Sequence, residues 1–147
     1  MTIITFSSDV LDTQEFTIDD TAPDGPDMTA IRTYIDGLQT DGGTAIYSAL
    51  EQAYADVGTA EAADPNRLYS IVLMTDGENN AGVDPDQFSK DYGVLPGPVQ
   101  AVRTYPVLFG EASKDAMTSI ATLTGGTLFD ATTTSLQTIF KQIRGYQ

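Results

Sequence analysis

The chain has 147 residues, with 7 basic against 21 acidic side chains, which gives a net charge of -14 at pH 7. This length predicts a single domain over residues 1–147, and the negative charge disfavours nucleic acid and anionic membranes as partners. Cysteine and histidine are both absent, which excludes disulfides, thiolate zinc sites and a Ser-His-Asp triad and leaves only hard cations held by oxygen as candidate metals.

The N-terminal segment predicts two strands and an acidic loop. Residues 2–7 form a β-branched and aromatic run typical of a strand, and residues 14–18 predict a second strand at a sheet edge, joined to the first as a hairpin. Residues 19–27 contain four aspartates and two prolines. Their spacing does not fit an EF-hand, which favours a solvated acidic loop over a calcium site.

Two helices follow, because apolar residues now recur at spacings of three and four. We expect Asp27 to cap the first helix. A glycine-containing link, TDGGT at residues 40–44, separates it from the second, which should end in a loop at residues 58–66. The apolar positions are Met28, Ile31, Ile35 and Leu38 in the first helix and Ile46, Ala49, Leu50, Ala53 and Val57 in the second.

Residues 68–74 form a nearly unbroken apolar run. Such a run predicts a strand of a parallel sheet that is covered on both faces. Asp76 follows at the carboxyl end of this strand, which is where open α/β sheets bind ligands. The alternative is that Asp76 only caps the following turn.

The C-terminal half continues the alternation of helix and strand. Asp84 and Pro85 are typical of an N-cap and a first helical position, and a turn-rich link at residues 93–98 follows that helix. Residues 104–109 predict an apolar strand, which Pro106 places near a sheet edge or at the strand's start.

Ser113 should cap the next helix and Gly125 should close it. Residues 126–130 predict the last strand. The final helix is marked by Leu136, Ile139, Phe140 and Ile143. The alternation of strands and helices from Asp27 onward predicts an α/β fold with a doubly wound, mostly parallel sheet flanked by helices.

One hydroxyl and one carboxylate stand out within this order. Thr44 lies between a glycine pair and the start of a helix, and Asp76 lies at the end of a strand, so both should open onto the same rim of the sheet. A hydroxyl and a carboxylate are hard oxygen ligands suited to Mg²⁺. Gly42 and Gly43 would let the backbone approach such an ion.

Two motifs in this region resemble those of a known family. GGTAIYSAL at residues 42–50 and IVLMTDGENN at residues 71–80 resemble the second and third motifs of the von Willebrand factor type A (VWA) domain. The segments TYPVLFG, IATLTGGTLFDA and SLQTIFKQI resemble its last two strands and closing helix, and residues 2–7 resemble its second strand. The resemblance therefore covers nearly the whole chain.

The resemblance implies a Rossmann-like domain with a metal-ion-dependent adhesion site. It makes Thr44 and Asp76 metal ligands, with Gly42, Gly43, Gly77 and Glu78 along the rim of the site. It also implies a non-catalytic protein-interaction or adhesion module, in which Mg²⁺ completes its coordination with a carboxylate from a protein ligand. An extracellular or cell-surface location is slightly favoured by the same resemblance.

The family's first motif, an Asp-x-Ser-x-Ser run after its first strand, has no counterpart here. SSDV at residues 7–10 has the same residue types in another order. We therefore expect a truncated VWA-like domain, a partial metal site and weak or absent Mg²⁺ binding by the chain alone. Without the central first strand, the sheet keeps a gap, closes by a strand shift, or accepts a strand from another chain. Unpaired edges predict a homo-oligomer or strand exchange.

Other functions are less well supported. The sequence MTDGE is superficially similar to the motif of aspartate-nucleophile phosphatases, but Met74 occupies the place of the nucleophile, which disfavours a Mg²⁺-dependent hydrolase. An inactive structural fragment of a larger VWA protein is the other alternative. No apolar run is long enough to cross a bilayer, so we expect no membrane insertion. The acidic, cysteine-free composition is compatible with either side of a bacterial membrane.

Overall fold

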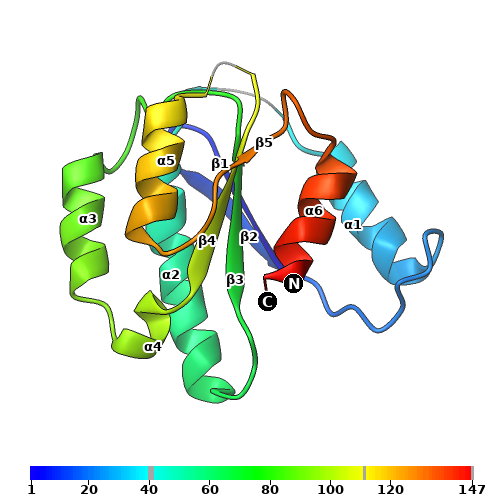
Figure 1. Ribbon diagram of the computed structural model, residues 1–147. Helices are drawn as coiled ribbons and strands as arrows, with labels where there is room; N and C mark the ends of the chain where they lie inside the picture. Colours follow the sequence, from blue (N-terminus) through cyan, green and yellow to red (C-terminus); the bar gives the residue numbers. More distant parts are fainter. Residues whose placement is uncertain (40–41, 111, 147) are drawn as a thin grey trace.

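The computed structural model describes residues 1–39, 42–110 and 112–146. The described strands form two separate sheets (Figure 1). The first is an antiparallel hairpin of β1 (Thr2–Phe6) and β2 (Val10–Glu15), and the second is a parallel sheet of β3 (Ser70–Thr75), β4 (Arg103–Leu108) and β5 (Phe129–Asp130) in that order. The helices are α1 (Pro26–Asp36), α2 (Ile46–Ala63), α3 (Pro85–Gly93), α4 (Gly97–Gln100), α5 (Lys114–Leu123) and α6 (Leu136–Gly145).

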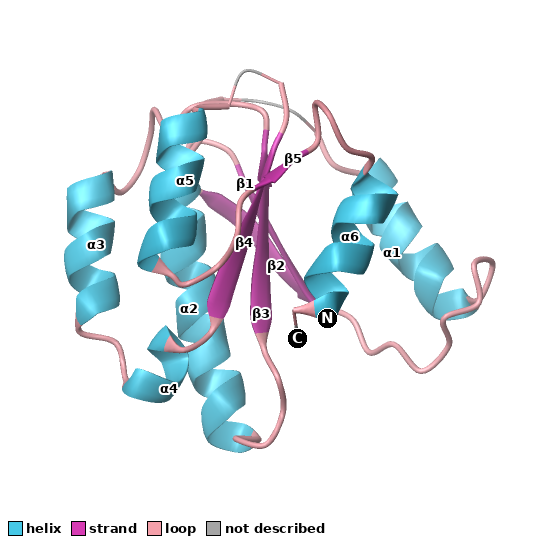
Figure 2. Cartoon of the chain, viewed as in Figure 1, coloured by secondary structure: helices cyan, strands magenta, loops and turns pink. Residues whose placement is uncertain are grey.

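Helices lie on both sides of the strands, which confirms the α/β, Rossmann-like class. Figure 2 shows α2, α3, α4 and α5 on one side and α1 and α6 on the other. In the larger core, side chains of α2 pack with those of α3, α4, α5 and Leu73 of β3. In the smaller core, side chains of α6 pack against β4 and β5. Helices on both faces are what a parallel sheet requires to bury its apolar side chains.

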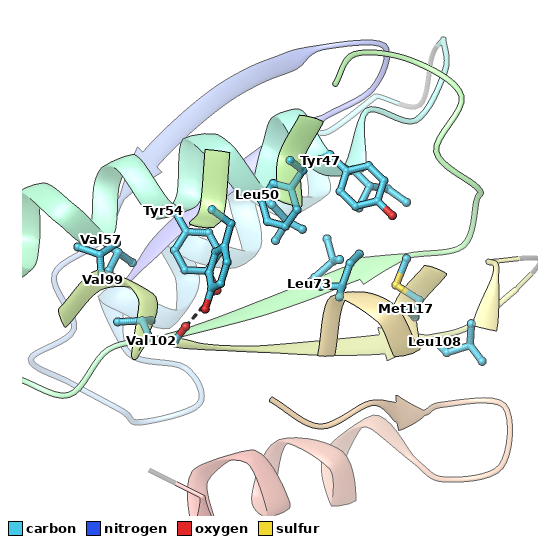
Figure 3. Packing of buried hydrophobic residues seen from close by; sticks show 13 residues of the cluster. Tyr47, Leu50, Tyr54, Val57, Leu73, Val99, Val102, Leu108 and Met117 are labelled. Carbon is cyan, nitrogen blue, oxygen red and sulfur yellow. Dashed lines mark hydrogen bonds between the residues drawn. The ribbon is translucent and has the colours of Figure 1, made fainter. Parts of the chain in front are cut away.

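The apolar face of α2 is the centre of the larger core. Tyr47, Leu50 and Tyr54 point from this helix toward the strands, with Leu73 opposite (Figure 3). The hydroxyl of Tyr54 is buried, hydrogen-bonds the Thr104 hydroxyl at 2.8 Å and lies 3.0 Å from a backbone carbonyl that it can donate to. Burial raises the pKa of Tyr54, so this phenol stays protonated and serves as a structural hydrogen-bonding group.

Several local signals are confirmed. The Asp84 side chain caps α3 by accepting from Gln87 N at 2.8 Å, and Pro85 takes the first helical position. Ser113 caps α5. Gly125 follows that helix with φ +67°, a left-handed conformation that glycine adopts without steric cost.

Two predictions for the N-terminal segment are wrong. The second strand lies at residues 10–15 rather than 14–18, because the chain reverses within residues 7–9. Asp27 does not cap α1, whose N-cap is Gly25. The Asp27 carboxylate instead accepts hydrogen bonds from the backbone N–H groups of Asp20 and Asp19, and these two bonds lower its pKa. The carboxylate thus organises the acidic loop before the helix.

Two predictions about helix extent are also wrong. Helix α2 continues through Gly58 to Ala63, where we expected a loop. A glycine costs about 1 kcal/mol inside a helix, which the packing of this long helix offsets. In the link after α3, expected to be all turn, residues 97–100 form the short helix α4.

Pro106 does not mark an edge or a strand start. It lies within β4, the central strand of the parallel sheet, and pairs in register with Leu73. Strand β5 pairs with β4 only at Val107 and Leu108, so β4 has neighbours on both sides only beyond the proline. The last strand is correspondingly short, covering Phe129–Asp130 rather than residues 126–130.

Strand β3 is not covered on both faces as predicted. Val72 and Met74 are each 36% exposed, and Leu68, expected within the strand, precedes it and is 76% exposed. Within the described residues β1 pairs only with β2, and β3 pairs only with β4. The strand shift that would close the sheet therefore does not occur, and the two sheets stay apart in this chain.

Candidate functional site

The loop before α2 bridges the carboxyl ends of β1 and β3. Ala45 N donates to the carbonyl of Ser7, directly after β1, at 2.7 Å. Asn80 N, beyond β3, donates to the carbonyl of Thr44 at 3.1 Å. We call this edge of the molecule the rim; it comprises residues 7–8, 42–45, 76–80 and Gly110.

Two asparagine side chains position the start of α2. The helix has no capping side chain of its own, since its N-cap is Ala45. Asn79 Oδ1 accepts from Ile46 N at 2.8 Å and thus satisfies one of the helix's unpaired donors. Asn80 Oδ1 accepts from Thr44 N at 2.7 Å. The loop after β3 therefore holds the loop before α2 in place.

Thr44 and the Asp76 segment meet at the rim. A Cβ added to Gly77 would lie 2.9 Å from Thr44 Oγ1, so the threonine hydroxyl lies against the residue that follows Asp76. A Cβ added to Gly110, which has φ +60°, would lie 2.7 Å from Asp76 Cβ. Asp76 is exposed. The absence of a side chain at Gly77 thus leaves room for the Thr44 hydroxyl, and its absence at Gly110 leaves room for Asp76 Cβ.

The glycine pair faces a serine from the hairpin. Gly43 N donates to Ser8 Oγ at 2.7 Å. Gly42 has φ +80°, and a Cβ there would lie 2.7 Å from the same oxygen. The close approach that we expected of Gly42 and Gly43 is thus made to Ser8. Glu78, expected along the rim, is exposed in the loop after β3.

Sequence reasoning missed three contributors to this rim. Ser8 lies in the SSDV segment, which seemed only an imperfect version of a motif. The sequence allows Asn79 to line the rim or to belong to a polar loop, but it does not indicate that its side chain caps a helix more than thirty positions earlier in the chain. Gly110 follows β4, and nothing in its local sequence indicates contact with Asp76.

The donor set at the rim fits Mg²⁺ only loosely. Among the described residues no group of three or more His, Cys, Asp or Glu side chains is placed to hold a metal. The oxygens of Ser8, Asn79 and Asn80 already accept backbone N–H groups. The rim also contains the Ser7 hydroxyl and the exposed Glu78 carboxylate, and Thr44 Oγ1 and the Asp76 carboxylate are the two hard ligands that the sequence predicts for the ion. Mg²⁺ prefers six oxygens and retains waters readily, so the rim suits a weakly held, largely hydrated ion.

A cavity lies away from the rim, between α2 and α3. It measures about 280 Å³ and is lined by Glu51, Tyr54, Ala55, Phe88, Asp91, Tyr92 and Leu95. Burial raises the pKa of Glu51, and the adjacent Asp91 side chain raises it further. The carboxylates of Glu51 and Asp91 therefore share a cavity that apolar side chains also line, and none of the lining residues belongs to the rim.

No helix in the described part of the chain has the length and apolarity to cross a bilayer.

Comparison with known proteins gives one family. The family model described as von Willebrand factor type A domain matches residues 1–142 of the 147-residue chain. No curated protein matches the chain. The family match covers both described sheets, helices α1 to α5, most of α6 and the rim.

Proposed function

The chain belongs to the von Willebrand factor type A family, and from this premise we propose that it is a non-catalytic module that binds another protein through its rim. Domains of this family are generally interaction modules without catalytic activity. The rim has the exposed carboxylate of Asp76 and the half-buried hydroxyl of Thr44, which lies close to Gly77. It offers a binding surface rather than an enclosed pocket for chemistry.

We further propose that Thr44 and Asp76 hold Mg²⁺ weakly and that a carboxylate of the protein ligand strengthens the binding. The observation that carries this proposal is the contact of Thr44 Oγ1 with Gly77, which brings the hydroxyl next to the Asp76 segment. A bound ion would act as a Lewis acid that attracts an anionic oxygen from the partner. A second anionic ligand matters because one carboxylate and one neutral hydroxyl leave most of the coordination sphere to water.

A second candidate function is favoured by the same donor set. With only one carboxylate among the two proposed ligands, the second candidate is a purely structural module within a larger VWA protein, without metal-dependent binding. The two candidates differ in one property. A binding module should show a saturable effect of Mg²⁺ that depends on Asp76, and a structural module should not.

Isothermal titration calorimetry of Mg²⁺ into the metal-free chain tests the proposal, with and without acetate as a stand-in for the partner's carboxylate. The chain is compared with Asp76→Ala and Thr44→Val. Asp115→Ala is the matched control, because Asp115 is an exposed carboxylate on α5 outside the rim. Constant ionic strength removes the general attraction of cations to a chain of charge -14.

The proposal predicts weak, saturable heat that acetate strengthens, that both rim variants abolish and that Asp115→Ala leaves unchanged. Equal heats in Asp76→Ala and the unmodified chain would reject a metal site at the rim and leave the structural candidate.

The homo-oligomer or exchanged strand that the sequence predicts would involve other residues, namely the outer edges of β1 and β3. Light scattering that finds a monomer at high concentration would count against it.

A further inference from the structure

The cavity between α2 and α3 combines two carboxylates with a wall of apolar side chains. It measures about 280 Å³, several times the roughly 30 Å³ that a water molecule occupies in the liquid, so it has room for an organic group. Helix α3 lies on the outer side of the molecule, away from α1 and α6 (Figure 1). The cavity is therefore a concave feature separate from the rim.

The two carboxylates approach each other from different helices. Glu51 of α2 and Asp91 of α3 are both half-buried, and their side chains interact. Burial raises the pKa of Glu51, and the nearby Asp91 raises it further, because two close negative charges repel each other. Asp91 Oδ2 accepts from Gln87 Nε2 at 2.7 Å, and this neutral donor holds the carboxylate in position.

No positive side chain neutralises this pair. Within the described part of the chain the one ion pair joins Arg32 to Asp24, so no lysine or arginine pairs with Glu51 or Asp91. Two adjacent carboxylates without a cation oppose folding when both are ionised. A bound cation between them would remove this repulsion and form charge-assisted hydrogen bonds with both.

The rest of the cavity is apolar and closely packed. Tyr54, Phe88 and Tyr92 are 1%, 2% and 8% exposed and contact one another, with the rings of Tyr54 and Tyr92 edge to face at a centroid distance of 5.2 Å. The hydroxyl of Tyr54 is bonded within the core, and that of Tyr92 donates to a backbone carbonyl at 2.7 Å. Ala55 and Leu95 add aliphatic carbon. The wall is thus formed in advance and offers little to a polar ligand.

These surroundings select one kind of cation. A divalent metal such as Mg²⁺ prefers six oxygens, and here two carboxylates face a wall of carbon. A guanidinium matches a single planar carboxylate with its rigid fork. An alkylammonium has three N–H donors on a compact charge, which can bond two carboxylates from two helices, and its methylene chain can pack on apolar side chains.

We propose that this cavity binds a primary alkylammonium group, with its nitrogen between Glu51 and Asp91 and its alkyl chain against Tyr54, Phe88 and Leu95. Two sources carry this chemistry, a free aliphatic amine and a lysine side chain of another protein. The site needs no metal and uses no residue of the rim. It goes beyond the proposed function, because it assigns a second ligand to a different part of the molecule.

A titration of ¹⁵N-labelled chain with n-pentylammonium chloride, followed by NMR, tests the site. EDTA is present, and the ionic strength is constant, so that the general attraction of cations to a chain of charge -14 is the same throughout. Ammonium chloride supplies the charge without the chain, and n-pentanol supplies the chain without the charge. A capped Gly-Lys-Gly peptide represents the protein source.

The variant Glu51→Gln/Asp91→Asn removes both charges, keeps the shapes of the side chains and keeps an acceptor for Gln87. Glu61→Gln/Asp86→Asn is the matched control, because it also removes one carboxylate from α2 and one from α3, and neither residue lines the cavity. The first variant relieves a repulsion, so it should have a Tm at least as high as the unmodified chain. Its loss of binding would therefore not reflect unfolding.

The proposal predicts saturable shifts from n-pentylammonium that centre on residues 51–55 and 88–95. Binding should be about tenfold or more weaker in Glu51→Gln/Asp91→Asn, and unchanged in the control. Ammonium chloride and n-pentanol should each bind about tenfold or more weakly than n-pentylammonium. Tighter binding of the peptide than of n-pentylammonium assigns a lysine side chain as the source, and the reverse order assigns a free amine; either order supports the site.

Three results would overturn the proposal. Equal affinity in Glu51→Gln/Asp91→Asn and the unmodified chain would show that the carboxylates do not hold the ligand. Equal affinity for n-pentanol or for ammonium would show that the charge or the chain is not recognised. Shifts spread evenly over the acidic surface would show that cations respond only to overall charge. Because EDTA is present throughout, none of these results bears on the metal site at the rim.

Discussion

Replacing Asn79 with alanine should destabilise the fold, because this side chain connects the rim to the start of α2 and to the loop that leads to α3. Its Oδ1 accepts from Ile46 N at 2.8 Å, and its Nδ2 donates to the carbonyl of Val83 at 3.2 Å. The first bond caps the central helix α2, and the second holds the loop that leads to α3. The variant removes both bonds and leaves a helix donor without a partner.

The size of the effect follows from these two bonds. Loss of an N-cap costs about 1 kcal/mol, within a range of about 0.5–2. Loss of a neutral hydrogen bond to a carbonyl costs about 1 kcal/mol more. The free energy of unfolding should therefore fall by about 2 kcal/mol, which corresponds to a decrease in Tm of roughly 4–8 °C for a chain of this size.

Urea and thermal unfolding followed by circular dichroism measure this change. Asn79→Asp is the matched variant, because it keeps an acceptor for the helix and adds a favourable charge at the N-terminus of α2, but loses the donor to Val83. We expect it to recover about half of the loss. If Asn79→Ala unfolds within about 0.5 kcal/mol of the unmodified chain, the side chain does not cap α2 and the account of the rim is wrong.

Three further changes test other parts of the structure. Gly77→Ala should displace the Thr44 hydroxyl, because the new Cβ lies 2.9 Å from it; we expect a loss of about 1–3 kcal/mol in unfolding free energy and weaker Mg²⁺ binding by calorimetry. Tyr54→Phe should cost about 1–3 kcal/mol in urea unfolding, since it leaves buried oxygens without their hydroxyl partner. Glu51→Gln should raise Tm at pH 7, because burial and Asp91 raise the pKa of Glu51 and its ionised form therefore opposes folding; the gain should vanish below the ordinary pKa of 4.5.

Matched variants separate these effects from general ones. Gly93→Ala controls for the added methyl group, because a Cβ at that position meets nothing within 4 Å. Tyr34→Phe removes a hydroxyl that bonds an exposed carboxylate rather than a buried oxygen. Glu61→Gln removes a carboxylate from α2 outside the cavity. A control that changes stability as much as its partner variant would contradict the mechanism given for that partner.

The features that sequence predicts well are those set by neighbouring residues. Asp84 and Pro85 begin α3 and Ser113 begins α5, because the capping bonds reach only three positions along the chain. The order of strands and helices is likewise set by local apolar periodicity. It was sufficient to indicate the α/β class and to place Thr44 before a helix and Asp76 after a strand.

The features that sequence does not predict depend on contacts between distant segments. Asp27 resembles an N-cap by its neighbours, but its carboxylate is taken by the backbone of the preceding loop. Glycine frequently terminates helices, yet α2 continues through Gly58 because the packing of the helix stabilises it there. The exposure of Val72 and Met74 depends on what packs against their face of β3, which their apolar character cannot reveal.

The rim likewise combines features that the sequence predicts with features that depend on contacts between distant segments. The glycines around Thr44 and the acidic end of β3 are visible as motifs, but their geometry is completed by Ser8 and Gly110 from two other loops and by the helix-capping bond of Asn79. Each of these residues acts through the fold rather than through its sequence neighbours. For this reason, the sequence could indicate where a metal would bind but not what holds the site in shape.

The most direct test of the proposed rim site is a titration of ¹⁵N-labelled chain with Mg²⁺, followed residue by residue by NMR at constant ionic strength. The account predicts saturable shifts confined to the rim and largest near Thr44, Asp76 and Gly77, with no comparable change in the acidic loop at residues 19–27. Shifts centred on that loop, or spread evenly over the acidic surface, would show that Mg²⁺ responds only to overall charge and would contradict a metal site at the rim.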